Sequence, residues 1–132
     1  MSNSKPVARP LSPHLQIYRP MLSMTMSILH RITGVGLAIG MIGLVWWFTA
    51  ASISDLYFGL AQAVFYHWFG RLVLFGFTWA LIHHMLGGFR HFIWDTGRGF
   101  ELRTVEWLVR ANVIGSVLLT IIIWVIGYGV RA

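Results

Sequence analysis

Three long stretches without a charged residue limit what this chain can fold into. They cover residues 32–54, 72–89 and 111–130, and are 23, 18 and 20 positions long. A helix of about 20 apolar residues crosses the roughly 30 Å hydrocarbon core of a bilayer. A helix also satisfies its own backbone hydrogen bonds in that water-free solvent. We therefore expect an all-α membrane protein with three transmembrane helices.

The composition supports this class and narrows the chemistry. The chain has 132 residues, 57% of them hydrophobic, and a mean hydropathy of +0.70, which exceeds that of soluble domains. It has no cysteine, which excludes disulfides and thiolate-held metal sites and leaves histidine as the strong ligand for a transition metal or haem. The formal charge is +6. Because these charges lie between the apolar stretches, membrane orientation explains them better than nucleic-acid binding, and we expect no nucleic-acid partner.

Proline divides the chain into two parts. All four prolines lie within the first 20 residues, where each removes a backbone donor and restricts the residue before it. Residues 1–20 are therefore predicted to form an arm on the membrane surface or on a partner. No cleavable signal peptide is predicted. Residues 21–132 are predicted to form a three-helix transmembrane anchor, with spans at about 24–53, 65–93 and 109–130.

The two connections differ in composition. We expect a short connection from Ser52 to about Val64, and we assign no function to the histidine that follows it, His67. The segment from Asp95 to Arg110 mixes arginines with acids and contains two nearby glycines, which mark a turn. It is predicted to be a surface loop with some amphipathic helix.

The basic residues fall unevenly on the two sides of these spans. Eight lie on the side of the amino terminus and the second connection, and two on the other side. By the positive-inside rule, the amino terminus faces the cytoplasm or the mitochondrial matrix, and the carboxyl terminus lies outside. This fits a bacterial inner membrane or a mitochondrial inner membrane. Arg71 and Arg90, which bound the second span, are expected to extend to opposite interfaces.

Histidine and glycine alternate along one face at the end of the second span. His84, Gly88 and His91 stand at i, i+4 and i+7. A haem whose iron binds an imidazole must lie against the helix that offers it, and Gly88 leaves room one turn from His84. The second imidazole must then come from elsewhere. The alternative is that Gly88 only permits close helix packing, and that the histidines hydrogen-bond to neighbouring helices.

A second group of polar residues begins the first span. Ser27, His30 and Arg31 stand at i, i+3 and i+4, so a hydroxyl, an imidazole and a guanidinium share one face at the inner membrane edge. Such a face can bind the polar head group of a lipid-soluble molecule, or carboxylates such as haem propionates. The alternative is an ordinary interfacial start of a helix, in which Arg31 reaches lipid phosphate and Ser27 caps locally.

Three runs of the sequence together resemble a known family. They are residues 9–18, residues 27–34, and His84-x-x-x-Gly88-x-Arg90-His91 followed by Trp94-Asp95. They look like the signatures of the cytochrome b subunits of succinate dehydrogenase (complex II), in the family's order, over about residues 9–99. The third span is similar only as an apolar helix. His83 departs from the commonest motif, which has an aromatic or apolar residue there.

The resemblance implies a set of partners and site residues. A second small membrane subunit would pack against this chain, and the pair would anchor a flavoprotein and an iron–sulfur protein, with membrane lipid around them. A haem b would lie between the two anchors, with His84 as one axial ligand to its iron and His30 and Arg31 by its propionates. Ser27 and Arg31 would belong to the ubiquinone site. His91 and Asp95 would contact the residues that bind the haem without binding it themselves.

The implied function is electron transfer from succinate oxidation to the quinone pool. This chain would hold part of the quinone site and half of the haem site, and therefore no complete catalytic site. One alternative is the haem-bearing anchor of a fumarate reductase or another quinone-linked complex. Another is a non-redox membrane assembly subunit in which the histidines only pack. The first two predict a haem Soret band in the purified complex, and the last predicts none.

Overall fold

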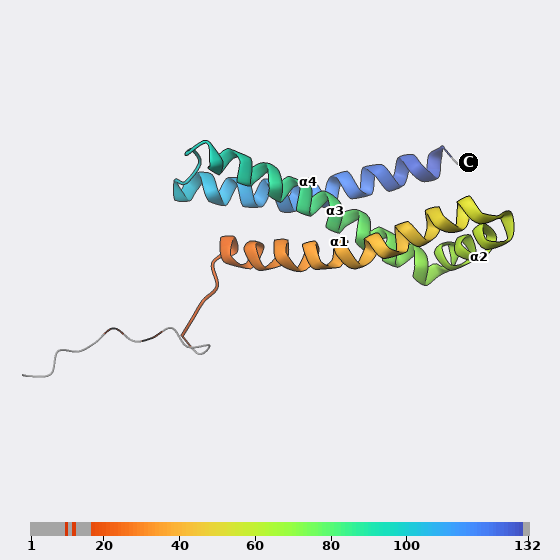
Figure 1. Ribbon diagram of the computed structural model, residues 1–132. Coiled ribbons are helices and arrows are strands. Elements are labelled where there is room, and N and C mark those ends of the chain that lie inside the picture. Colours follow the sequence, from red (N-terminus) through yellow and green to blue (C-terminus); the bar gives the residue numbers. More distant parts are fainter. Residues whose placement is uncertain (1–9, 11, 13–16, 131–132) are drawn as a thin grey trace, which may run out of the picture.

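The computed structural model describes residues 10, 12 and 17–130, and within that part the chain is helical and contains no strand (Figure 1). The helices are α1 (Leu22–Ile53), α2 (Asp55–Tyr66), α3 (Trp68–Asp95) and α4 (Leu102–Gly129). Helices α1, α3 and α4 are long and apolar enough to cross a membrane. The expected all-α membrane fold with three spanning helices is thus confirmed. Of the arm predicted for residues 1–20, positions 1–9, 11 and 13–16 lie outside the described residues.

The three long helices lie beside one another, with α1 and α4 running in one direction and α3 in the opposite direction (Figure 1). Helix α1 begins at the same end as the turn that joins α3 to α4, and we call this the histidine end because it contains His30, His84 and His91. The opposite end holds α2. Helix α3 packs against both α1 and α4. With 32 residues, α1 is about 48 Å long, so it extends beyond a hydrocarbon core of roughly 30 Å.

The first connection is itself a helix, α2, where the sequence predicted only a short link. Ser54 caps its start by accepting a hydrogen bond from the backbone N–H of Tyr57 at 3.4 Å. Asp55 in the first turn adds a favourable charge at that end of the helix. His67 then caps α3, because its Nδ1 accepts from the backbone N–H of Phe69 at 3.4 Å. This local role accounts for His67.

The corner between α2 and α3 depends on a glycine. Gly70 is buried, and a Cβ added there would collide with the carbonyl oxygen of Val64 and the backbone of Phe65. Only a residue without a side chain lets the two helices meet so closely.

The second connection contains the predicted turn. Gly97 and Gly99 have φ angles of 74° and 79°, which favour glycine. The indole N–H of Trp94 donates to the carbonyl oxygen of Gly99 at 3.1 Å and fixes the turn against α3. The helix expected within this segment is the start of α4, which begins at Leu102 and so precedes the predicted span at about 109–130. The short turn brings the end of α3 and the start of α4 together.

Polar groups join α3 to α4 along their buried seam. His83 lies 3.4 Å from the hydroxyl of Ser116, measured from Nδ1 to Oγ. The side-chain amide of Asn112 bonds to α3 when it is oriented with its oxygen towards Gly87. The oxygen then accepts from the backbone N–H of Gly87 at 3.2 Å, and the nitrogen donates to the carbonyl oxygen of His83 at 3.3 Å. Towards the α2 end, the indole N–H of Trp124 donates to the Thr78 hydroxyl at 3.3 Å. These hydrogen bonds satisfy polar groups that the hydrocarbon of a membrane cannot solvate.

Candidate functional site

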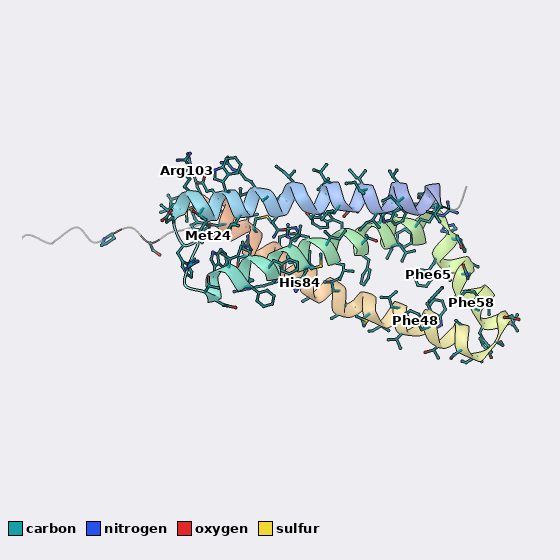
Figure 2. All side chains as sticks on the ribbon, turned by 90° about the horizontal axis from the view of Figure 1, so that it is seen from above. Met24, Phe48, Phe58, Phe65, His84 and Arg103 are labelled. Atoms are coloured by element: carbon teal, nitrogen blue, oxygen red, sulfur yellow. The ribbon has the colours of Figure 1, made fainter. Side chains whose placement is uncertain are left out.

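His84 projects from α3 onto α1, where the two helices cross (Figure 2). Its Nδ1 lies 3.0 Å from the backbone carbonyl oxygen of His30 and 3.4 Å from the hydroxyl oxygen of Thr33. A carbonyl oxygen only accepts hydrogen bonds, so Nδ1 carries the proton. The neutral ring then keeps its lone pair on Nε2. That nitrogen makes no hydrogen bond with any described residue and is not buried, so no described group competes for its lone pair.

The side chain of His30 lies directly on the His84 ring. The two ring centroids are 3.9 Å apart and the planes differ by 6°. The ring of His91, one further turn along α3, lies 5.4 Å from that of His30. The structure therefore brings together three of the predicted site residues, from helices whose motifs are more than 50 positions apart.

The neighbouring glycines Gly87 and Gly88 have different surroundings. A Cβ at Gly87 would lie 2.5 Å from Nδ1 of His30, so this glycine is what lets His30 pack against α3. A Cβ at Gly88 would have no neighbour within 4 Å. Within the described chain, close helix packing depends on Gly87 and not on Gly88. The surface of α3 one turn beyond His84 is therefore open at Gly88 within the described chain.

His83 lies on another face of α3 from His84. It is 1% exposed and is buried against α4, where it contacts Ser116 and lies 5.1 Å from the ring of Trp79. A ligand approaching the open side of His84 does not meet it. His83 therefore belongs to the α3–α4 seam.

Ser27 and Arg31 are exposed on α1, with Ser27 about one turn before His30 and Arg31 directly after it. Neither side chain makes a hydrogen bond or ion pair with any other described residue. Asp95 is likewise exposed at the end of α3 and has no such contact in the described part of the chain. These three predicted site residues face outwards at the histidine end, where groups outside this chain can reach them.

Arg90 does not extend to the interface as the sequence predicted. It is 4% exposed, because it shares the His83 and Gly87 face of α3 that packs inside the bundle. Its guanidinium lies 5.0 Å from the centre of the Trp94 ring, within range of a cation–π contact. Its Nε and Nη1 atoms are buried without a hydrogen-bond partner in the described structure. Arg71 at the other end of α3 is exposed and lies over Tyr66.

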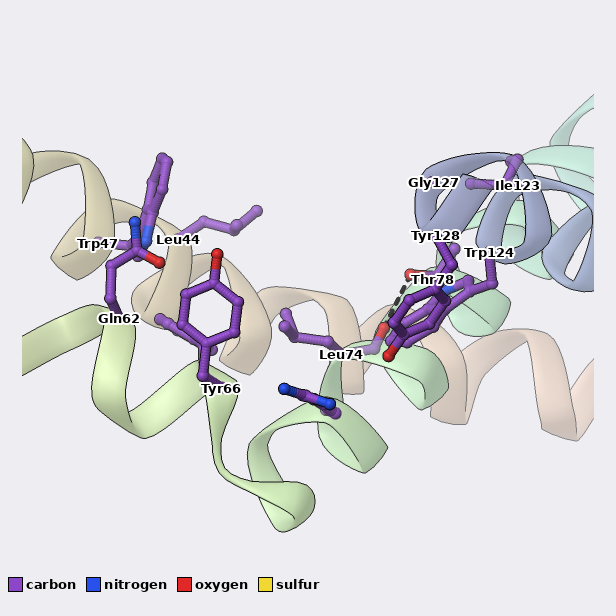
Figure 3. Close-up of a pocket in the computed structure, with 12 residues that line it drawn as sticks. Leu44, Trp47, Gln62, Tyr66, Leu74, Thr78, Ile123, Trp124, Gly127 and Tyr128 are labelled. Carbon is purple, nitrogen blue, oxygen red and sulfur yellow. Dashed lines mark hydrogen bonds between the residues drawn. The ribbon is translucent and has the colours of Figure 1, made fainter. Parts of the chain in front are cut away.

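A cavity of about 470 Å³ opens at the α2 end, and all four helices contribute to it (Figure 3). Its lining is mainly aromatic and aliphatic, with Arg71 and the hydrogen-bonded pair Thr78 and Trp124 among its polar members. None of the predicted site residues lines it. It is therefore separate from the histidine cluster, defined as His30, His84 and His91.

The described residues contain no group of three or more histidine, cysteine, aspartate or glutamate side chains arranged to hold a metal ion. The imidazoles of His30 and His84 lie face to face and do not converge on one point. Among the described residues, therefore, none stands ready to join His84 as a second ligand to the same metal.

Comparison with known proteins gives the family. The family described as succinate dehydrogenase/fumarate reductase transmembrane subunit matches residues 5–126. The chain belongs to this family. Two similar proteins, one from Rickettsia typhi and one from Paracoccus denitrificans, are each named succinate dehydrogenase cytochrome b556 subunit. The first is 41% identical over 117 residues, covering 89% of this chain and 91% of the relative. The second is 42% identical over 114 residues, covering 86% and 88%.

A plant relative extends the comparison. The succinate dehydrogenase cytochrome b560 subunit of Marchantia polymorpha is 40% identical over 105 residues, covering 75% of this chain and 76% of the relative. The resemblance noted from the three sequence runs is thus confirmed. As a member of this family, the chain is a membrane subunit of an oxidoreductase complex and is not itself the catalytic subunit.

Thr33, Gly34 and Gly87 contact the imidazoles and were not singled out from the sequence. Thr33 and Gly34 do end the run of residues 27–34. They could have been found from their spacing, because residues three and four positions after His30 lie on the same face of the helix.

Proposed function

We propose that the chain is the cytochrome b membrane anchor of a succinate dehydrogenase, sharing a b-type haem and a quinone-reduction site with its partner subunits. The observation that carries the proposal is the environment of His84. Its Nδ1–H donates a hydrogen bond to the His30 carbonyl oxygen of α1, and its Nε2 has no hydrogen-bond partner among the described residues, on the side of Gly88. The names of the relatives, which include cytochrome b, support a haem.

The residues present fit a haem shared between two chains. His84 would supply one axial imidazole through Nε2, and the second would come from the second small membrane subunit. His30 and Arg31 would pair with the propionates, while His91, whose ring lies tilted against that of His30, and the outward-facing Asp95 would support this edge. A bound haem supplies a one-electron carrier. This chain's own contribution is to fix the ligand's tautomer and to leave space at Gly88.

Ser27 and Arg31 would form this chain's part of the quinone site. Both are exposed at the histidine end and have no competing partner among the described side chains. A hydroxyl and a guanidinium can donate hydrogen bonds to a ubiquinone carbonyl and so orient it at the membrane edge. Exclusion of water by the partner subunits would strengthen these contacts. The iron–sulfur and second anchor subunits would complete the pocket.

An exposed apolar stripe on α1 favours an assembled protein. Ile28, Ile32, Val35 and Ile39 recur at helical spacing and are 58–65% exposed. In the proposed complex this stripe contacts the second anchor or lipid, and the histidine end faces the flavoprotein and iron–sulfur subunits. The excess of basic residues at that end supports its assignment to the cytoplasmic or matrix side of a bacterial or mitochondrial inner membrane. The carboxyl terminus then lies outside.

The test is affinity purification of the complex through a tag on this chain. A succinate-oxidising flavoprotein, an iron–sulfur protein, a second small membrane subunit and stoichiometric b-type haem should copurify. A fumarate reductase anchor would give the same cofactors but a complex that favours fumarate reduction with a low-potential quinol. A chain that purifies without flavin, iron or haem would support the non-redox assembly role instead.

A further inference from the structure

Thr33 is a buried hydroxyl that the proposed haem and quinone contacts do not use. It lies on α1 and is 4% exposed. Its Oγ1 is 2.9 Å from the carbonyl oxygen of Leu29 and 2.9 Å from that of His30. The single hydroxyl hydrogen can satisfy one of these carbonyls at a time. In either case the oxygen keeps lone pairs that can accept a hydrogen bond.

The neighbour that can donate to this oxygen is His84. Its Nδ1 lies 3.4 Å from Oγ1 of Thr33 and 3.0 Å from the carbonyl oxygen of His30, so its N–H is shared between two acceptors. The next residue touches the same ring, because a Cβ at Gly34 would lie 3.0 Å from Cε1 of His84. One turn of α1 therefore contacts both the proton-bearing nitrogen and the adjacent ring carbon.

We propose that Thr33 is a positioning residue for His84, and that its hydroxyl oxygen sets the orientation and electron-donating strength of the imidazole that binds the haem iron. This rests on the proposed function. Hydrogen bonds from the non-ligating nitrogen of a histidine make the other nitrogen more basic. A more basic ligand stabilises ferric over ferrous iron and lowers the reduction potential. Loss of the Thr33 acceptor should therefore raise that potential.

The chain offers a matched control in Thr78. This threonine also lies within a long helix, donates to a carbonyl four residues back at 2.8 Å, and accepts from an aromatic N–H of another helix at 3.3 Å. It lies at the α2 end, away from the histidine cluster (Figure 3). Thr78→Val thus removes a similar hydroxyl from a similar setting without touching His84.

The experiment measures the haem midpoint potential and the low-spin ferric haem EPR spectrum of the purified complex. Thr33→Val should shift the potential upwards and change the g-values, whereas Thr33→Ser, which retains the hydroxyl, should match the wild type. Thr78→Val should also match it. Thr33→Ala removes the same hydroxyl with a smaller side chain and gives the same comparison if the valine variant does not assemble.

An unchanged potential in Thr33→Val or Thr33→Ala would overturn the proposal, as would a shift in Thr33→Ser as large as that in Thr33→Val. An equal shift in Thr78→Val would overturn it too, because the effect would then be general to helix packing. A wild-type complex without b-type haem is a different result. It would reject the proposed function itself.

Discussion

The imidazole rings of His30 and His84 lie face to face, with their centroids 3.9 Å apart and their planes 6° apart. One ring comes from α1 and the other from α3, so this contact joins the two polar motifs of the sequence into one site. Gly87 makes the contact possible, because any side chain there would meet His30. A change at this glycine should therefore affect the site differently from a change at Gly88.

Gly87→Ala should lower the stability of the protein, whereas Gly88→Ala should reduce only its haem content. The alanine methyl at 87 would press on His30, and such overpacking costs about 1–3 kcal/mol. The methyl at 88 meets nothing in the chain but would occupy the space proposed for the macrocycle. We expect a lower thermal midpoint for Gly87→Ala, and normal assembly with a reduced haem-to-flavin ratio for Gly88→Ala.

Gly76→Ala on the same helix is the control, since that position also has open space. It should change neither quantity. Full haem retention in Gly88→Ala would show that the macrocycle does not lie against this turn of α3.

His83→Leu should retain the haem and weaken the α3–α4 seam. His83 is buried, bonds to Ser116 and lies away from the open side of His84. Loss of its hydrogen bond leaves the Ser116 hydroxyl with its own backbone acceptor, at a cost of about 1 kcal/mol. Thermal unfolding and haem content of the purified complex measure the two effects. A loss of haem in the intact complex would make His83 a ligand candidate.

Arg31→Ala and Ser27→Ala should impair quinone reduction more than succinate oxidation by an artificial dye. Both side chains are exposed and unpaired within the described chain, so their removal leaves the helix packing intact. Rates with quinone and with dye, measured on the same preparation, separate the two steps. Arg103→Ala, a change of another exposed arginine at this end (Figure 2), is the control. Equal losses in both assays would indicate a failure of assembly.

Trp124→Phe should lower stability without changing the haem. The substitution removes the hydrogen bond from the indole N–H to Thr78, which is worth roughly 0.5–1.5 kcal/mol, and keeps an aromatic ring beside Phe75. These residues lie on the α2 side of His84 and make no contact with the histidine cluster. We expect a lower thermal midpoint and an unchanged haem spectrum. A changed spectrum would show that the two ends of the bundle are coupled.

The lengths of the uncharged apolar stretches were enough to predict the three spans, and helical spacing was enough to predict the shared face of His84, Gly88 and His91, because both are local properties of the sequence. Neither could predict that Thr33 contacts His84, since these residues are 51 positions apart and meet only where α1 crosses α3. Arg90 was misplaced because a flanking charge suggests an interface, whereas its face of α3 turns inwards. Helix α2 was missed although Ser54-Asp55 is a recognisable helix start. The roles of Ser27, Arg31 and Asp95 remain predictions, because their contacts require other chains.

The most direct test of the account is the dithionite-reduced minus oxidised absorption spectrum of the purified complex, with and without His84→Tyr. His83→Leu serves as the neighbouring control, and copurified flavin reports assembly. The account predicts a b-type α-band in the wild type and in His83→Leu, and its loss in assembled His84→Tyr. A wild-type complex with bound flavin but no such band, or a band that survives in His84→Tyr, would contradict it.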